Sequence, residues 1–277
     1  MFVFKAAVVG AGTMGGEIAT AIANADIPVV LKDVEERYLE RGLDRARSLW
    51  EGLEQSERER RLALITPTTS YERLGDVDFV VEAVPERIEL KREVFAELDA
   101  ATPGHAVLAS NTSSLSITEM GLATTRPELV VGLHFFFPAA VNRLVEVIEG
   151  DDTSPETVQA ASAFAQSIRK TPIRCADVPG FVVNRILTAA VSEVWRHQEQ
   201  TGADTSELDR LVAESGAAPL GPFALADVLG LDTVLYVSEY LQQCYGERFH
   251  VHQGMRDLVA AGELGVKTGK GFYEHRR

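Results

Sequence analysis

The sequence predicts an α/β fold in two parts: a domain with a mainly parallel sheet, followed by an all-α helical domain. Over residues 1–175, short apolar runs alternate with helical stretches, which is typical of repeated strand–helix units. The pattern changes after Pro179 and Gly180, where helical periodicity continues without strand punctuation. The length of 277 residues agrees with two domains of roughly 150 residues each, or with one large domain.

The expected elements follow one another in a regular order. Apolar strands are expected at residues 3–9, 28–33, 77–83, 106–110, 129–134, 144–148 and 172–175. Helices are expected at residues 12–25, 37–53, 86–98 and 155–168, and then at 181–200, 205–214, 223–229 and 233–245. The charged stretch 51–61 is interpreted as a solvated helix end or a hairpin tip. We place the boundary near residue 178, so the two domains are expected at residues 1–178 and 179–277.

The composition argues against several classes of protein. Of the residues, 45% are hydrophobic and 25% are charged, as in ordinary globular proteins. Subtracting 41 acidic from 27 basic side chains leaves a net charge of −14, which disfavours nucleic acids and membrane surfaces as partners. No apolar run reaches the roughly 18 residues of a membrane span, and the start of the chain lacks the basic region of a signal peptide. Cys175 and Cys244 have no metal-binding spacing, so we expect a cytoplasmic protein without a metal, in which Cys175 is a buried structural thiol.

A glycine motif follows the first expected strand and opens the first helix. Its residues are Gly10, Ala11, Gly12, Thr13, Met14 and Gly15, a GxGxxG. The first glycine permits a tight turn, the second lets the backbone approach a pyrophosphate, and the third allows close packing of helix and strand. Asp33 ends the second strand and can accept hydrogen bonds from a ribose hydroxyl, which favours NAD over NADP. The motif therefore predicts a Rossmann-like, NAD-binding domain; a plain strand–turn–helix with a capping Asp is the alternative.

Several further motifs occur in order along the chain. They are Val81-Glu-Ala-Val-Pro-Glu86, Glu89-Leu-Lys91, Ser110-Asn-Thr-Ser-Ser114, His134-Phe-Phe-Phe-Pro138, Leu144-Val-Glu-Val-Ile148, Asp177-Val-Pro-Gly-Phe-Val-Val-Asn-Arg185 and Lys267-Thr-Gly-Lys-Gly-Phe-Tyr273. This ordered set resembles the short-chain L-3-hydroxyacyl-CoA dehydrogenases, often called 3-hydroxybutyryl-CoA dehydrogenases in bacteria. The resemblance implies an NAD-dependent enzyme that acts on an acyl-CoA thioester, with a helical domain that forms a homodimer and closes over the substrate.

The resemblance also implies roles for individual residues of the reaction site. His134 falls on the catalytic histidine of the family, and Glu146 falls on the carboxylate that orients it. Ser113 falls on the serine that contacts the substrate oxygen and the cofactor, and Asn184 on the asparagine that completes the site. Read without the family, His134 could be a core histidine, Glu146 an outward strand residue, Ser113 a helix cap, and Asn184 a residue bonded to the backbone.

Three charged residues fall on cofactor-contacting positions of the family. They are Glu86, Lys91 and Lys267. The alternative for each lysine is a solvated charge, Lys91 on a helix and Lys267 in a glycine-rich tail.

The residue types themselves suit the oxidation of a secondary alcohol. Such a reaction needs a base for the hydroxyl proton and an acceptor for the hydride, and a neutral imidazole is a suitable base near pH 7. His134 ends an expected strand, and Glu146 lies 12 residues further on. A turn at residues 138–142 would bring the two strands side by side and place the carboxylate against the ring, where it would stabilise the imidazolium.

Two features depart from the family pattern. Phe137 replaces the usual asparagine, so its side chain is expected either to enter an apolar pocket or to narrow the substrate slot. Cationic or hydroxyl partners for the coenzyme A phosphates are also hard to assign after Asp33. The candidates are Arg41, Arg45, Ser48, Arg58, Arg60 and Arg61, for which a solvated face with charge pairs is the alternative. The acyl carrier therefore stays open between coenzyme A and a protein-bound phosphopantetheine, as do the acyl chain length and the direction of the reaction.

Three functions are compatible with these motifs. The first is hydride transfer between NAD and C3 of a short-chain (S)-3-hydroxyacyl-CoA or 3-oxoacyl-CoA. The second is a dehydrogenase of a carrier-bound or free hydroxy acid, of which the aromatic run after His134 disfavours the free acid. The third is a non-catalytic, NAD-binding structural protein, which would not need His134, Glu146, Ser113 and Asn184 together.

Overall fold

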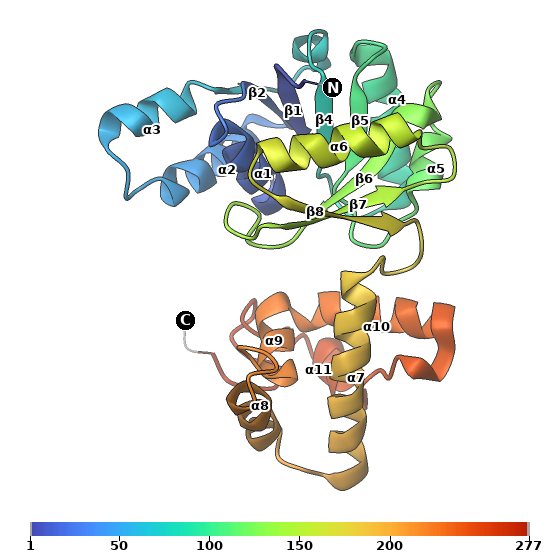
Figure 1. Cartoon of the computed structure of the whole chain (residues 1–277). Helices are drawn as coiled ribbons and strands as arrows, with labels where there is room; N and C mark the ends of the chain where they lie inside the picture. Colours follow the sequence, from blue (N-terminus) through green and yellow to red (C-terminus); the bar gives the residue numbers. More distant parts are fainter. Residues whose placement is uncertain (1, 276–277) are drawn as a thin grey trace. The chain divides into compact units, whose positions relative to one another are not determined.

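Strand β1 (Ala6–Val9) lies inside an eight-stranded sheet whose order is β3-β2-β1-β4-β5-β6-β7-β8. The computed structural model describes residues 2–275 and divides into two units, residues 1–181 and 182–277, each described here by itself (Figure 1). The other strands are β2 (Val29–Lys32), β3 (Ile65–Thr68), β4 (Phe79–Glu82), β5 (Val107–Ser110), β6 (Val130–Phe135), β7 (Leu144–Glu149) and β8 (Thr171–Ala176). Every neighbouring pair is parallel except β6 and β7, so the predicted mainly parallel sheet is confirmed.

The connecting helices cover both faces of this sheet. They are α1 (Thr13–Ala23), α2 (Glu36–Leu49), α3 (Gln55–Leu62), α4 (Ile88–Ala101), α5 (Ile117–Gly121) and α6 (Pro155–Ser167), with short 3-10 turns at Tyr71–Leu74 and Pro127–Leu129. The chain moves from β1 to β2 in one direction along the sheet and from β4 to β5 in the opposite direction. Because such connections are right-handed, α1 and α4 lie on opposite faces of the sheet. In Figure 1, α6 crosses in front of the sheet and α4 lies behind it.

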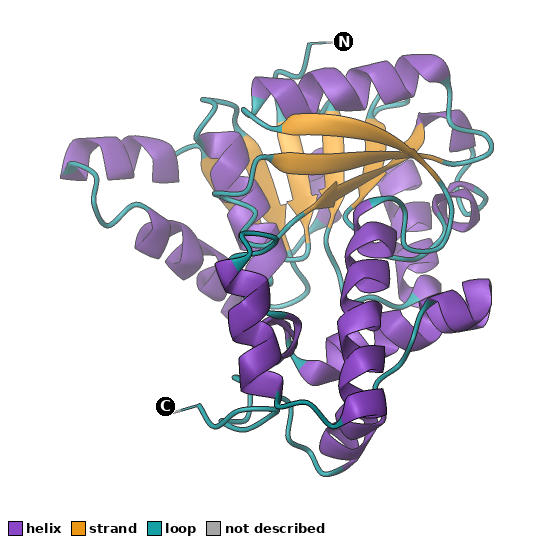
Figure 2. Cartoon of the chain, turned by 60° about the horizontal axis from the view of Figure 1, so that its bottom comes forward, coloured by secondary structure: helices purple, strands orange, loops and turns teal. Residues whose placement is uncertain are grey.

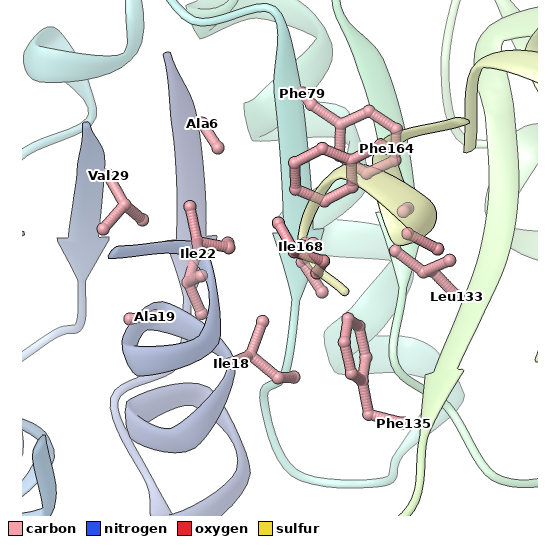
Figure 3. Close-up of a cluster of buried hydrophobic side chains, with 14 of the residues drawn as sticks. Ala6, Ile18, Ala19, Ile22, Val29, Phe79, Leu133, Phe135, Phe164 and Ile168 are labelled. Atoms are coloured by element: carbon pink, nitrogen blue, oxygen red, sulfur yellow. The ribbon is translucent and has the colours of Figure 1, made fainter. Parts of the chain in front are cut away.

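The larger apolar core fills the space under α1 and α6. Ile18 and Ile22 of α1 point towards the sheet, and Phe164 of α6 stacks on Phe79 of β4 with ring centroids 4.2 Å apart (Figure 3). Phe135, the last residue of β6, belongs to the same cluster. The end of β6 is therefore held rigidly by core packing, which matters because His134 precedes Phe135.

Residues 51–70 differ from the expectation. A short helix, α3, is followed by the edge strand β3, which the sequence analysis did not predict. The strand has only four residues and contains Pro67, and Ile65 is its single buried residue. Proline is tolerated on an edge strand because its missing N–H faces away from the ladder, so this strand has almost no apolar signal in the sequence.

The second unit consists mainly of helices, and the strands of Figure 2 all lie in the first unit. Its helices are α7 (Val183–Thr201), α8 (Thr205–Glu214), α9 (Pro222–Leu229), α10 (Leu231–Tyr245) and α11 (Gln253–Ala260), with a 3-10 turn at Gly246–Arg248. Trp195, Phe223, Leu231 and Met255 form its buried core. Gly202 ends α7 at φ +66°, and Asp204 then caps α8 by accepting a hydrogen bond from the backbone N–H of Glu207. The predicted fold class, a Rossmann-like domain followed by a helical domain, is confirmed.

Candidate functional site

The glycine loop has the geometry that a bound dinucleotide requires. Gly10 adopts φ +101°, and a Cβ there would lie 2.6 Å from the carbonyl oxygen of Ala83. A Cβ on Gly15 would lie only 1.7 Å from the carbonyl oxygen of Gly10, so α1 can approach β1 this closely only with glycine. Gly12 precedes α1 without any side-chain cap, and a Cβ there would meet nothing within 4 Å. The start of α1 thus carries no side-chain cap, which fits a pyrophosphate bound at the helix N-terminus.

Asp33 is fixed beside this loop by two backbone hydrogen bonds. Its Oδ2 accepts from the N–H of Ala11 at 2.6 Å, and its Oδ1 accepts from the N–H of Val34 at 2.6 Å. A carboxylate has about four lone-pair positions, so acceptor capacity is left for a ribose hydroxyl. The predicted residue thus lies next to the predicted loop, at the carboxyl end of β2.

A buried ion pair that the sequence pattern does not predict lies at the ends of β4 and β5. Lys91 of α4 is 1% exposed, and its Nζ lies 2.7 and 2.9 Å from the two carboxylate oxygens of Glu82. Glu82 Oε2 also accepts from Ser110 Oγ at 2.6 Å, and Oε1 accepts from the N–H of Val84. Such a pair is stable only when the remaining lone pairs are satisfied, as they are here. Lys91 is therefore not the solvated helix charge considered as its alternative role.

Glu86 connects this ion pair to Ser113. Its Oε1 accepts from Thr112 Oγ1 at 2.6 Å, from the N–H of Ser113 at 2.8 Å and from Ser113 Oγ at 3.1 Å. Its Oε2 lies 3.4 Å from Lys91 Nζ. Burial acts to raise the pKa of Glu86, but Lys91 and these hydrogen bonds outweigh burial and hold the pKa below its ordinary value. The structure thus brings Glu86, Lys91 and Ser113 together, while their contacts with a cofactor stay predictions.

His134 and Glu146 face each other across the antiparallel pair of β6 and β7. They are register partners, and His134 Nδ1 lies 2.8 Å from Glu146 Oε2. His134 is 7% exposed and Glu146 is 0% exposed, so the contact is shielded from water. Because Nδ1 faces the carboxylate, Nε2 is the nitrogen that can exchange a proton with a substrate. The hairpin expected from the turn at residues 138–142 is therefore present, with the carboxylate against the ring.

Two neighbours of this pair, Asn111 and Cys175, have no role at the site that their sequence positions predict. The Oδ1 of Asn111 accepts a hydrogen bond of 2.9 Å from the backbone N–H of Phe135, which ties the loop after β5 to the end of β6. The Sγ of Cys175 on β8 lies 3.7 Å from Glu146 Oε1. Cys175 is buried, as expected, but it also contacts the carboxylate that holds His134. A pattern of β-strands could not reveal this contact, because it depends on the parallel register of β7 and β8.

Phe137, one of the two departures from the family pattern, lies in the segment after His134. Phe137 is 54% exposed, so it does not enter an apolar pocket. Other residues hold the hairpin in place. The N–H of Ala140 donates a hydrogen bond to Glu17. Lys170 Nζ donates to the carbonyl oxygens of Ala139 and Asn142. Phe137 is thereby left as a residue that could narrow a substrate slot.

The arginines considered for coenzyme A are partly engaged within the protein. Arg45 forms an ion pair with Glu17, which is completely buried, and Arg60 pairs with Asp26 and Glu57. Arg61 also pairs with Glu57, and the guanidinium of Arg41 lies over the ring of Tyr38. Charge pairing, the alternative considered for this stretch, thus accounts for Arg45, Arg60 and Arg61.

Asn184 and Lys267 lie in the helical unit. Asn184 is in the first turn of α7, and Lys267 Nζ donates to Asp232 Oδ1 at 2.7 Å and to Thr233 Oγ1 at 3.2 Å. Lys267 therefore holds the start of α10. The roles predicted for these two residues towards substrate and cofactor stay predictions.

Comparison with known proteins places these features in a family. Residues 5–178 match the family model of the 3-hydroxyacyl-CoA dehydrogenase NAD-binding domain, and residues 180–275 match that of the 3-hydroxyacyl-CoA dehydrogenase C-terminal domain. The chain belongs to the 3-hydroxyacyl-CoA dehydrogenase family. The predicted enzyme class, an NAD-dependent dehydrogenase of this family, and the predicted cofactor are thereby confirmed.

Individual relatives of this dehydrogenase differ in length. The chain is 37% identical over 277 residues to a probable 3-hydroxybutyryl-CoA dehydrogenase of Deinococcus radiodurans, and the match covers 98% of this chain and 100% of that protein. It is 40% identical over 278 residues to the fatty acid oxidation complex subunit alpha of Shewanella amazonensis, but spans only 39% of that subunit's length. The crystal structure of (S)-3-hydroxybutyryl-CoA dehydrogenase from Ralstonia eutropha superposes with a TM-score of 0.94 at 37% identity, covering 100% of both chains. Every helix of this dehydrogenase within residues 2–275 is too short or too polar to cross a lipid bilayer.

Proposed function

We propose that this dehydrogenase transfers hydride between NAD and C3 of a short-chain (S)-3-hydroxyacyl-CoA, with (S)-3-hydroxybutyryl-CoA and acetoacetyl-CoA as the substrate pair. The observation that carries the proposal is the buried contact of 2.8 Å between His134 Nδ1 and Glu146 Oε2. A buried imidazole held by a carboxylate on one nitrogen is a base with its other nitrogen directed at the substrate. The names of the relatives of matching length in Deinococcus radiodurans and Ralstonia eutropha support the short-chain substrate.

In the proposed reaction, His134 Nε2 accepts the proton of the C3 hydroxyl as the hydride leaves C3. NAD, when bound, takes up that hydride and returns it in the reverse reaction. Glu146 stabilises the imidazolium that forms, and the same histidine returns the proton when a 3-oxoacyl group is reduced. Ser113 and Asn184 are proposed to hydrogen-bond the substrate oxygens, a contribution that is typically worth about 3 kcal/mol per donor in the transition state.

We propose that the cofactor lies along the glycine loop of residues 10–15. The N–H groups at the start of α1 would hold the pyrophosphate, and Asp33 would accept from the adenosine ribose. Glu86, Lys91 and Lys267 are proposed as further cofactor-contacting residues. Since Lys91 is also bonded to Glu82, we assign it the additional task of holding Glu86 in place.

The decisive experiment mixes purified protein with NADH and acetoacetyl-CoA and follows the loss of NADH absorbance. Free acetoacetate and an acetoacetyl carrier protein are assayed in parallel. Activity with acetoacetyl-CoA supports the proposal, whereas activity with free acids alone would discard the thioester substrate. Tight NADH binding without activity on any of the three would favour the non-catalytic alternative.

We propose further that the chain forms a homodimer through its helical unit and works in the cytoplasm. Ile186 and Leu187 of α7 are exposed apolar residues that a second copy could cover. Trp195 does not contribute to such a surface, because it is buried in the core of the same unit. Light scattering of the purified protein would show twice the mass of 30.2 kDa for a dimer.

A further inference from the structure

A cleft of about 770 Å³ opens on the first unit, away from the glycine loop. It lies between the end of α1, helix α3, the tip of the β6–β7 hairpin, and the turn from α6 into β8. The lining residues are Ala21, Asn24, Arg61, Ala140, Val141, Arg143, Gln166, Ile168, Arg169 and Lys170. The volume is in the range of small-molecule sites.

The lining carries an excess of positive charge. Four of its ten residues are Arg or Lys, namely Arg61, Arg143, Arg169 and Lys170, and none is acidic. The whole chain has the opposite balance, with a net charge of −14. Four cations from three distant segments of an acidic chain therefore meet in one cleft, which concentrates a field that attracts anions.

Two of these cations are already engaged, and two are not. Arg61 pairs with Glu57, and Lys170 Nζ donates to the carbonyl oxygens of Ala139 and Asn142. Arg143 and Arg169 are exposed, and within residues 2–275 neither forms an ion pair. Their guanidinium groups therefore keep their donors for a ligand, in the planar arrangement that matches phosphate oxygens.

Lys170 is the buried cation among the residues that line the cleft. It is 6% exposed, and burial lowers its pKa. The nearby positive charge of Arg143 lowers that pKa further, while Glu17 acts in the opposite direction. Arg143 and Lys170 thus repel each other in the protein alone, and a bound anion would relieve this repulsion.

We propose that this cleft binds a phosphoryl group through Arg143 and Arg169, and that the phosphates of the coenzyme A part of the substrate are its source. The assignment of the source rests on the proposed function. A coenzyme A thioester carries a diphosphate and a 3′-phosphate far from the reacting carbonyl. A contact to these phosphates that is equally strong in the ground state and the transition state lowers the KM without changing kcat. Inorganic phosphate or a free nucleotide has the same chemistry and is the other possible source.

The test uses the double variant Arg143→Gln, Arg169→Gln and two substrates. Acetoacetyl-CoA carries the phosphates, whereas acetoacetyl-pantetheine keeps the reacting thioester and lacks them. The double variant is expected to raise the KM for acetoacetyl-CoA by about tenfold, the effect of losing one charge-assisted hydrogen bond. Its KM for acetoacetyl-pantetheine, its KM for NADH and its kcat should stay unchanged.

The matched control is Arg92→Gln. Arg92 is an exposed arginine of α4 outside the cleft, so its variant removes a positive charge without changing the lining. The double control Arg73→Gln, Arg92→Gln has the same total charge as the double variant. These controls should behave as the wild type. A KM for acetoacetyl-CoA that rises equally in the controls would mean that only the overall charge matters, and would overturn the proposal.

Titration calorimetry with inorganic phosphate and with adenosine 3′,5′-bisphosphate separates the sources. Loss of inorganic phosphate binding in the double variant, with an unchanged KM for acetoacetyl-CoA, would keep the phosphoryl site and overturn coenzyme A as its source. Unchanged kinetics together with unchanged binding of both probes would overturn the site itself. If the wild type reduces neither thioester, the proposed function fails, and the two titrations still decide whether the cleft binds phosphoryl groups.

Discussion

His134 and Glu146 are directly opposed register partners of an antiparallel strand pair, and their side chains meet at 2.8 Å inside the protein. Antiparallel partners lie closer than any other residues of two strands, so the distance is set by the backbone and needs no flexible loop. The β6–β7 pair is the one antiparallel step in a sheet that is otherwise parallel. Because β7 runs antiparallel to β6, the Glu146 carboxylate lies beside His134 at the carboxyl edge of the sheet.

Replacing the proposed base should abolish most of the turnover without harming cofactor binding. We expect His134→Gln to lower kcat by at least about a hundredfold, the usual scale for loss of a general base. NADH affinity should be nearly unchanged, because the glycine loop and Asp33 lie on other elements. Steady-state kinetics and a fluorescence titration with NADH measure both quantities. A variant that keeps near wild-type turnover would refute the role of His134.

Asp33→Ala should relax the preference for NAD over NADP. Removing the carboxylate removes an acceptor for the ribose hydroxyl and the repulsion of a 2′-phosphate. It also removes the hydrogen bond to the N–H of Ala11, so some loss of NAD affinity should accompany the change. The ratio of kcat/KM for the two cofactors is the measurement. Asp33→Asn, which keeps an acceptor oxygen but no charge, separates the two effects; unaltered discrimination in both variants would mean that another group reads the ribose.

Glu86→Gln should make the free energy of unfolding depend less on pH in the acidic range. The pKa of Glu86 lies below its ordinary value of 4.5, because Lys91 and hydrogen bonds outweigh the burial that acts to raise it. The folded state therefore binds this proton more weakly than the unfolded state does. Its stabilising contribution is complete above about pH 4.5 and is lost as the pH falls through the lower folded pKa.

Urea unfolding between neutral pH and about pH 3 measures this effect. The free energy of unfolding of Glu86→Gln should be lower than that of the wild type at neutral pH, and should fall less as the pH decreases. A variant with the same pH slope as the wild type would show that Glu86 does not carry the acid sensitivity.

Cys175 should act as a positioning residue for Glu146. Its Sγ lies 3.7 Å from the carboxylate oxygen that does not face His134. Cys175→Ser keeps a donor and should retain kcat within about twofold, whereas Cys175→Val removes the donor and should lower kcat by about threefold to tenfold. The KM for NADH should stay constant in both. If circular dichroism shows that both variants are folded and their kcat values are equal, Cys175 contributes only to packing and does not position Glu146.

Local sequence accounts for much of the first unit. Gly10 and Gly15 stand where only the absence of a Cβ lets the loop turn and the helix pack, and Asp33 follows directly at the end of a buried strand. These features depend on neighbours within one strand–helix–strand unit, so their spacing is visible in the sequence. The hairpin of His134 and Glu146 was predictable for the same reason, since a short turn joins the two strands.

Which charges meet depends on contacts between elements that are far apart in the sequence. Glu82, Lys91 and Ser110 come from three elements and form one buried cluster, and Arg45 closes onto Glu17 from another helix. The cleft with Arg143 and Arg169 likewise collects residues from separate parts of the chain. A charged side chain looks the same in sequence whether it is solvated or buried, because its partner is chosen by the packing of helices on the sheet. Local sequence patterns thus account for the glycine loop, the fold class and the opposed pair of His134 and Glu146, while long-range packing determines how the charges around them are paired.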